Sequence, residues 1–126
     1  MDDYPLRTAG GCSIQHAGAA WDAVRVPHEF GLRALSILGP RTGAVVETTC
    51  FVYWFVPAGT ADSWDVAGTR AVGRGSWVSV PPHRRTEGPG PHWRVCPAEE
   101  AWLTDPAGLR AALDDARTTA PVTVAS

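Results

Sequence analysis

The sequence predicts an α+β fold, with helices packed on one face of a mixed or antiparallel sheet. Two observations indicate this class: several short segments rich in β-branched and aromatic residues, and two longer segments whose apolar residues recur at helical spacing. Their order is strand, helix, several strands and a closing helix. A chain of 126 residues, 44% of them hydrophobic, is long enough for one core and too short for two.

We expect three parts along the chain. Residues 1–20 are rich in glycine and alanine without a clear period, which predicts an irregular N-terminal arm. A single α+β domain is expected over residues 21–117. Residues 118–126 follow the closing helix and are predicted to form a flexible tail, because chain ends fray unless something packs on them.

The first predicted elements are a strand and a helix. Trp21–Val26 alternates between apolar and polar residues, which favours a strand, and Pro27 ends it. His28–Leu38 carries apolar residues three and four positions apart, which predicts a helix. The Gly39-Pro40 pair ends that helix.

The middle of the chain is predicted to form strands. Gly43–Val56 is rich in valine, threonine and aromatic residues but is too long for one ordinary strand. We therefore expect two strands with a bend near Thr48–Cys50. Cys50 lies in an apolar run and is expected in the core. Pro57–Asp65 is predicted to be a loop or a single helical turn.

Further short strands are predicted at residues 70–72, 76–80 and 92–95, with a glycine turn at residues 73–75. Pro81–Pro91 contains four prolines and two glycines among its eleven residues, which excludes regular secondary structure there. The sheet is therefore expected to be interrupted by one stiff loop.

The closing helix has a clear start signal. Asp105 is a favourable N-cap and Pro106 suits the first helical position. The helix is predicted to run to about Arg117. Its inward-facing residues are expected to be Leu109, Ala112, Leu113 and Ala116.

The charge of the chain limits the kinds of partner it can attract. Its formal net charge is −2, and all eleven basic residues are arginines. Domains that bind nucleic acid through overall charge usually carry a basic excess. That mode of binding is therefore excluded, and any basic site must be local.

Metal and cofactor sites are not predicted. The three cysteines lie far apart with no C-x-x-C motif, and the four histidines have no zinc-site spacing. The two glycines of residues 73–75 are too few for a dinucleotide or phosphate-loop fingerprint. We expect no metal, no cofactor and reduced cysteines.

No membrane contact is expected either. The longest apolar run is strand-sized, well short of the roughly 18 residues that a membrane span needs. The first residues are acidic and lack the basic and apolar regions of a signal peptide. The expected location is the cytoplasm.

Three stretches in this order carry a family resemblance: WDAVRVPHEFGLRAL at 21–35, FVYWFVPAGT at 51–60 and GRGSWVSVPPHRRTEGPGPHWRV at 73–95. Together they resemble the primase-polymerase domain of plasmids and phages, a branch of the archaeo-eukaryotic primase superfamily. The third is the most specific, because it combines a glycine turn, a strand, a double proline and a returning aromatic. The resemblance implies a primase-polymerase-like fold with an RRM-like core.

Departures from the family's pattern bear on activity. The family holds two divalent metals with acidic residues and contacts nucleotide phosphates with a histidine. The first acidic position matches Asp22, and the second falls on Val24. The histidine position falls on Phe51 and the third acidic position on Arg70. Because valine and arginine cannot ligate magnesium, primase or polymerase activity is not expected.

The segment 81–94 is the main candidate binding site. Arginine forks pair with phosphate oxygens, tryptophan or histidine can stack on a base, and prolines hold such groups in place. Arg70 and Trp77 are further candidates. The candidate residues within the segment are His83, Arg84, Arg85, Trp93 and Arg94. The alternative for the loop is a solvated segment whose arginines serve solubility, and most of the six tryptophans are expected in the core.

A second hypothesis places acid/base chemistry on this domain. Asp22 would act as a general base, and a histidine such as His92 or His28 would complete the pair. The alternative for Asp22 is a surface or hydrogen-bonded aspartate on a strand.

Three functions therefore stay open. The first is a non-catalytic primase-polymerase-like domain that binds nucleic acid, a nucleotide or another anionic ligand through the 81–94 loop. The second is a small enzyme of specialised metabolism acting on a small anionic or aromatic substrate. The third is an adaptor that docks a protein partner or a second copy of itself through exposed tryptophans.

Overall fold

The helices and strands follow one another along the chain much as the sequence predicts. The computed structural model describes residues 13–18, 20–82, 85–97 and 102–119. Its strands are β1 Ser13–His16, β2 Trp21–Pro27, β3 Val45–Glu47, β4 Phe51–Pro57, β5 Arg70–Val72, β6 Trp77–Val80 and β7 His92–Val95. Its helices are α1 His28–Leu38 and α2 Pro106–Thr119, with short 3-10 turns at Gly39–Arg41 and Thr60–Ser63. The predicted α+β class is confirmed.

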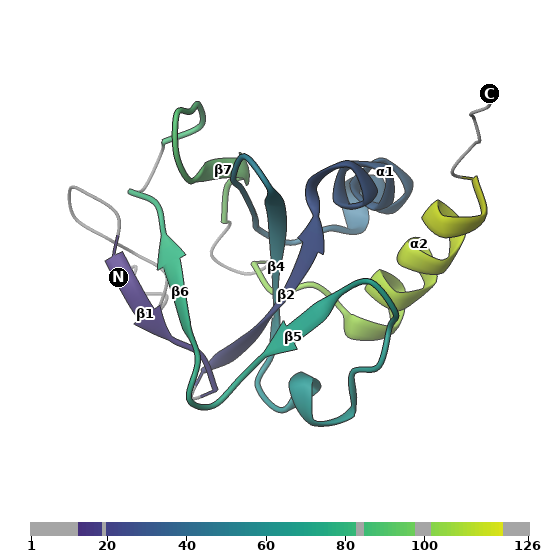
Figure 1. Cartoon of the computed structure of the whole chain (residues 1–126), viewed down its shortest axis with the longest axis horizontal. Coiled ribbons are helices and arrows are strands. Elements are labelled where there is room, and N and C mark those ends of the chain that lie inside the picture. Colours follow the sequence, from purple (N-terminus) through teal and green to yellow (C-terminus); the bar gives the residue numbers. More distant parts are fainter. Residues whose placement is uncertain (1–12, 19, 83–84, 98–101, 120–126) are drawn as a thin grey trace.

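Five strands form one antiparallel sheet in the order β5-β2-β4-β3-β7. Strands β2 and β3 run in the same direction with β4 between them, and α1 connects the two, which makes a split β-α-β unit. β1 and β6 pair separately as a two-stranded antiparallel ribbon. Figure 1 shows this β1–β6 ribbon on the left, the sheet in the middle and both helices on the right.

Both helices pack on one face of the sheet, as predicted. Asp105 Oδ2 accepts a hydrogen bond from the Gly108 N–H at 3.0 Å, so it caps the start of α2 as its residue type favours. The apolar stripes of the helices then close over the sheet. The core on this face includes Val24, Val26, Ala34, Leu38, Trp54, Leu109, Leu113 and Ala116.

The β1–β6 ribbon covers part of the opposite face. Val78 and Val80 of β6 are buried against a group of aromatic rings from the sheet. Trp21 and Phe55 meet edge to face, with ring centroids 5.1 Å apart, and the Trp93 ring lies 6.0 Å from Phe55. A small domain thus gains a second core by burying large rings on the face that the helices leave open.

The predicted bend between β3 and β4 has a local cause. The Thr48 hydroxyl accepts a hydrogen bond from the Phe51 N–H at 3.0 Å and lies 3.1 Å from the Phe51 carbonyl oxygen, to which it donates. The Thr48 N–H donates to the same oxygen at 2.8 Å. A threonine side chain therefore closes a turn that has neither glycine nor proline.

Three expectations need correction. The arm predicted over residues 1–20 is not irregular throughout, because Ser13–His16 pair with β6 as β1, while residues 1–12 and 19 lie outside the described residues. Cys50 is exposed instead of buried, because it lies in the bend before β4 and not in the strand itself. Of the tail predicted from residue 118, residues 118 and 119 still belong to α2 and 120–126 lie outside the described residues.

Neither α1 nor α2 combines the length and the apolar character that crossing a bilayer requires, and no other described segment forms such a helix.

Candidate functional site

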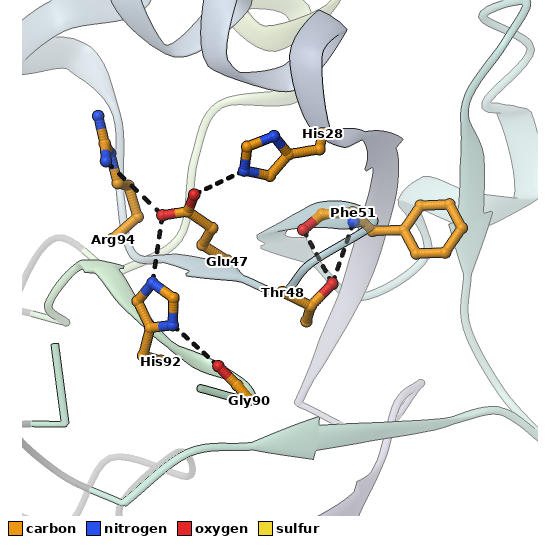
Figure 2. Close-up of polar contacts among 7 residues, drawn as sticks. All are labelled: His28, Glu47, Thr48, Phe51, Gly90, His92 and Arg94. Carbon is orange, nitrogen blue, oxygen red and sulfur yellow. Dashed lines mark hydrogen bonds and ion pairs between the residues drawn. The ribbon is translucent and has the colours of Figure 1, made fainter. Parts of the chain in front are cut away.

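A charged cluster joins three elements at one end of the sheet. Glu47, the last residue of β3, lies between His28 at the start of α1 and His92 and Arg94 of β7 (Figure 2). The His28 Nε2 atom is 2.6 Å from Glu47 Oε2, and the His92 Nε2 atom is 3.2 Å from Oε1. The Arg94 guanidinium approaches Oε1 to 3.6 Å. One carboxylate thus connects α1, β3 and β7.

The surroundings of Glu47 favour its charged form. Only 14% of its side chain is exposed, and this burial by itself raises the pKa. Hydrogen bonds from His28 and His92 and the charges of Arg94 and His92 outweigh the burial, so the pKa of Glu47 lies below its ordinary value. The carboxylate is therefore ionised at neutral pH.

Both ring nitrogens of His92 face acceptors. Nδ1 is 2.9 Å from the Gly90 carbonyl oxygen, which can only accept, and Nε2 faces the ionised Glu47. Both ring nitrogens of His92 are therefore already engaged in contacts with the protein.

Two arginines face each other on the face of the sheet opposite the helices and the Glu47 cluster. Arg25 of β2 and Arg70 of β5 are direct partners in the antiparallel register, so their side chains leave the same face, roughly 5 Å apart at Cβ. Neither side chain has an ion pair or hydrogen bond to any residue that the structure describes. Like charges directly opposite one another destabilise a sheet. This Arg25–Arg70 pair therefore lacks a counter-ion within the part of the chain that the structure describes.

Aromatic rings adjoin the Arg25–Arg70 pair. Tyr53 of β4 is the other cross-strand partner of Arg25, so it stands on the same face. The Arg25 guanidinium lies over the Phe51 ring, 4.5 Å from its centroid. Figure 2 shows that this ring is directed away from the Glu47 cluster. We call Arg25, Arg70, Phe51 and Tyr53 the arginine–aromatic face.

Asp22 has a structural role at the other end of β2. Its Oδ2 accepts hydrogen bonds from the N–H groups of Gly59 at 3.0 Å and Ala61 at 2.8 Å. The residue is 2% exposed, and Oδ1 has no hydrogen-bond partner among the described residues. This arrangement matches the alternative given for Asp22, a hydrogen-bonded aspartate on a strand, and not a general base.

The structure does not bring Asp22 and His92 together. Asp22 pairs with Val56 of β4, whereas Glu47, the partner of His92, pairs with Val52. Asp22 and His92 are thus about 13 Å apart along the strands and about 14 Å apart across the sheet. His28 contacts the same Glu47, so it too is remote from Asp22. No acid/base pair forms between Asp22 and either histidine.

Among the described candidate residues of the 81–94 loop, one is buried and two are exposed. His83 and Arg84 lie outside the described residues, and Arg85 is exposed. Trp93 is 2% exposed, and its indole N–H donates to the Pro82 carbonyl oxygen at 3.1 Å. Its ring belongs to the core and cannot stack on a ligand at the surface. Arg94 is about half exposed and is directed to Glu47.

The remaining predicted residues lie on other elements. Arg70 belongs to the arginine–aromatic face. Trp77 of β6 is 60% exposed, and among the described residues no other large hydrophobic side chain is exposed. Val78 and Val80 point from the ribbon toward the sheet, so Trp77, one position before Val78, points to the other side of the ribbon. Trp77 is therefore not part of the arginine–aromatic face.

Glu47 and Arg25 were not predicted from the sequence. Glu47 becomes a charged centre only through register, since residues 28, 47 and 92 come from three separate elements. The sequence did contain a signal for Arg25. It is a charged residue within the predicted strand Trp21–Val26, and Arg70 lies in another predicted strand, so the two can face each other if the strands pair antiparallel. Only the register itself was unknown.

The metal site implied by the family resemblance does not suit this chain. Val24 is fully buried under the helices, and Arg70 and Phe51 stand on the opposite face. No group of three or more histidine, cysteine, aspartate or glutamate residues among the described residues is arranged to hold a metal ion. Asp22 is thus the one acid at these positions.

Comparisons of the chain with protein-family models, with curated proteins and with solved structures find no match. The resemblance to the primase-polymerase domain therefore stays a prediction.

Proposed function

We propose that this domain is a non-catalytic binding module for a ligand that carries both phosphate and base, either single-stranded nucleic acid or a nucleotide. The ligand binds on the arginine–aromatic face. The observation that carries the proposal is the direct cross-strand pairing of Arg25 and Arg70, for which residues 13–18, 20–82, 85–97 and 102–119 supply no counter-ion. A phosphate between the two guanidinium groups offsets their repulsion and accepts their hydrogen bonds.

The neighbouring rings support a base as the second part of the ligand. Tyr53 and Phe51 flank Arg25 on the same face of the sheet, and both are partly exposed. Aromatic side chains and arginine planes on a sheet surface stack on unpaired bases without reading their sequence. Net charge −2 makes such binding local and modest, so it depends on these few residues.

The absence of catalysis is part of the proposal. It is supported by Val24 and Arg70 at positions where the family resemblance would require metal-binding acids. We expect no magnesium-dependent primer synthesis from this chain. Detecting such synthesis would refute the non-catalytic assignment.

The test is fluorescence anisotropy with a labelled oligothymidylate of 12 nucleotides at low salt. We expect the Arg25→Gln/Arg70→Gln variant to lose affinity by at least about tenfold, since each charge-assisted hydrogen bond is worth more than 1 kcal/mol. The matched control, Arg41→Gln/Arg110→Gln, removes the same charge from exposed or partly exposed residues of other elements and should retain binding.

Two further arms locate the site and the ligand. An Arg84→Gln/Arg85→Gln variant that loses binding while Arg25→Gln/Arg70→Gln retains it would place the site in the 81–94 loop instead. Displacement of the oligonucleotide by micromolar thymidine monophosphate would identify a nucleotide as the ligand. Displacement only at millimolar concentration would identify the nucleic-acid strand.

A further inference from the structure

The two guanidinium groups of the arginine–aromatic face are accessible to a ligand. Arg70 is exposed and Arg25 is partly exposed, and no residue in the described part of the chain forms an ion pair or hydrogen bond with either side chain. The Phe51 ring covers one flat side of the Arg25 guanidinium, whose N–H groups lie in its plane and point sideways. The pair therefore offers two planar forks of N–H donors.

The strand neighbours of these arginines do not offset their charge. Apart from Arg70, the direct and diagonal partners of Arg25 on β4 and β5 are uncharged: Tyr53, Phe51, Phe55 and Val72. The diagonal partners of Arg70 on β2, Ala23 and Pro27, are uncharged as well. The pair thus presents two positive charges side by side, which a ligand group with two negative charges would neutralise.

Phosphate occurs in nucleic acids and nucleotides in two forms that differ in charge and in free oxygens. An internal phosphodiester has one negative charge and two free oxygens. A terminal phosphomonoester carries a charge of about −1.5 to −2 at pH 7 and three acceptor oxygens. Three oxygens can serve two guanidinium forks with one oxygen shared, whereas the two oxygens of a diester must serve both forks alone. The monoester therefore matches the Arg25–Arg70 pair in both charge and number of acceptors.

Tyr53 provides a place for the nucleoside that carries this phosphate. It is the partner of Arg25 on the side away from Arg70, one strand spacing of about 4.8 Å further across the sheet. Its side chain is partly exposed, and no described residue forms a hydrogen bond with its hydroxyl group. With a phosphate between the arginines, the ring is available for stacking and the hydroxyl for a hydrogen bond to the same ligand.

We propose that the arginine–aromatic face selects a terminal phosphomonoester over an internal phosphodiester. Its ligand is then the phosphorylated end of a single strand or a nucleoside monophosphate. This inference rests on the proposed function, and it adds which kind of phosphate the Arg25–Arg70 pair prefers.

The test is fluorescence anisotropy of the whole chain at low salt with internally labelled oligothymidylates of equal length. One strand has hydroxyl groups at both ends, and two others carry a phosphate at the 5′ or the 3′ end. We expect at least one phosphorylated strand to bind at least about tenfold more tightly than the hydroxyl strand, the factor expected for one additional charge-assisted hydrogen bond. Equal affinity of the three strands would overturn the proposal.

A methyl ester of the preferred terminal phosphate is the matched control. It keeps the phosphorus but turns the monoester into a diester with one charge, so its affinity should return to that of the hydroxyl strand. A methyl ester that binds as tightly as the free terminal phosphate would contradict the proposal. Displacement of the phosphorylated strand by micromolar thymidine monophosphate would identify a nucleotide as the source of the monoester, and displacement only at millimolar concentration would identify a strand end.

Variants of the chain assign the preference to the arginine pair. Arg25→Gln/Arg70→Gln should bind phosphorylated and hydroxyl strands equally, whereas Arg41→Gln/Arg110→Gln should keep the tenfold preference. In case the double variant perturbs folding, Arg70→Gln at an exposed position should by itself reduce the preference to less than about threefold. A preference that survives both changes would contradict the assignment.

The same measurements separate this inference from the proposed function. If the parent protein shows no preference but Arg25→Gln/Arg70→Gln weakens binding of the hydroxyl strand, the proposed function stands and this inference fails. If the parent protein binds none of the strands, both fail.

Discussion

Arg25 and Arg70 are direct cross-strand partners on β2 and β5, and neither has a counter-ion among the described residues. A sheet gains nothing from two like charges at this spacing. The pair is therefore expected to cost stability in the absence of the proposed ligand.

This cost leads to a prediction about the unliganded protein. Arg25→Gln/Arg70→Gln should increase the free energy of unfolding by about 0.2–1 kcal/mol, because it removes the repulsion. Urea unfolding at low salt measures the effect, and added salt should shrink it by screening the charges in the parent protein. A variant less stable than the parent would show that these arginines serve the fold.

A second prediction concerns Glu47. Glu47→Gln should lower the free energy of unfolding by about 1–3 kcal/mol at neutral pH, because hydrogen bonds from His28 and His92 to a charged acceptor are lost. Urea unfolding measures this change. Glu47→Asp, which keeps the charge on a shorter side chain, is the control and should cost less.

The pKa of Glu47 also fixes a pH dependence. Its pKa is lowered in the folded protein, so the folded state favours the ionised carboxylate. The resulting stabilisation is present above the unfolded pKa of about 4.5 and is lost as pH falls through the lower folded value. The difference in stability between parent and Glu47→Gln should therefore shrink in that acidic range. A difference that stays constant from pH 7 to pH 3 would contradict the cluster.

The sequence was most informative where local chemistry decides structure. The bounds of α1 follow from Pro27 before it and Gly39-Pro40 after it, and the start of α2 from Asp105 and Pro106. β1 escaped prediction because Ser13–His16 is a strand only through its pairing with β6, more than sixty residues later. Long-range pairing leaves little trace in a short segment.

The candidate site was less predictable for the same reason. The sequence singled out the 81–94 loop by composition, but composition does not reveal that Trp93 is buried against Phe55 or that His92 binds Glu47. It also placed Arg70 correctly as a strand residue without showing that Arg25 stands opposite. Sheet register, which one sequence does not specify, decides these contacts.

Asp22 is predicted to stabilise the turn after β4. Asp22→Ala should lower the free energy of unfolding by about 1–3 kcal/mol, because it leaves the Gly59 and Ala61 N–H groups without their acceptor. Asp22→Asn should cost less, since the amide oxygen can take the place of Oδ2. Thermal unfolding of the two variants distinguishes these outcomes, and equal losses would argue against the capping role.

Trp93 is predicted to act in the core and not in binding. Trp93→Ala should cost about 3–5 kcal/mol, because it removes a large ring that is 2% exposed. The milder Trp93→Phe should fold and bind the oligonucleotide with parental affinity in the anisotropy assay. If a fully folded Trp93→Phe variant lost affinity for the oligonucleotide, Trp93 would have a role in binding, contrary to this prediction.

The most direct test of the arginine–aromatic face is the salt dependence of oligonucleotide binding. Each phosphate contact to a single strand contributes about 0.7 to the slope of the logarithm of affinity against the logarithm of salt concentration. Because the two arginines share one phosphate, loss of both should reduce the slope by about 0.7 relative to the parent protein, while Arg41→Gln/Arg110→Gln keeps the parental slope. An unchanged slope in Arg25→Gln/Arg70→Gln would contradict phosphate binding by this pair.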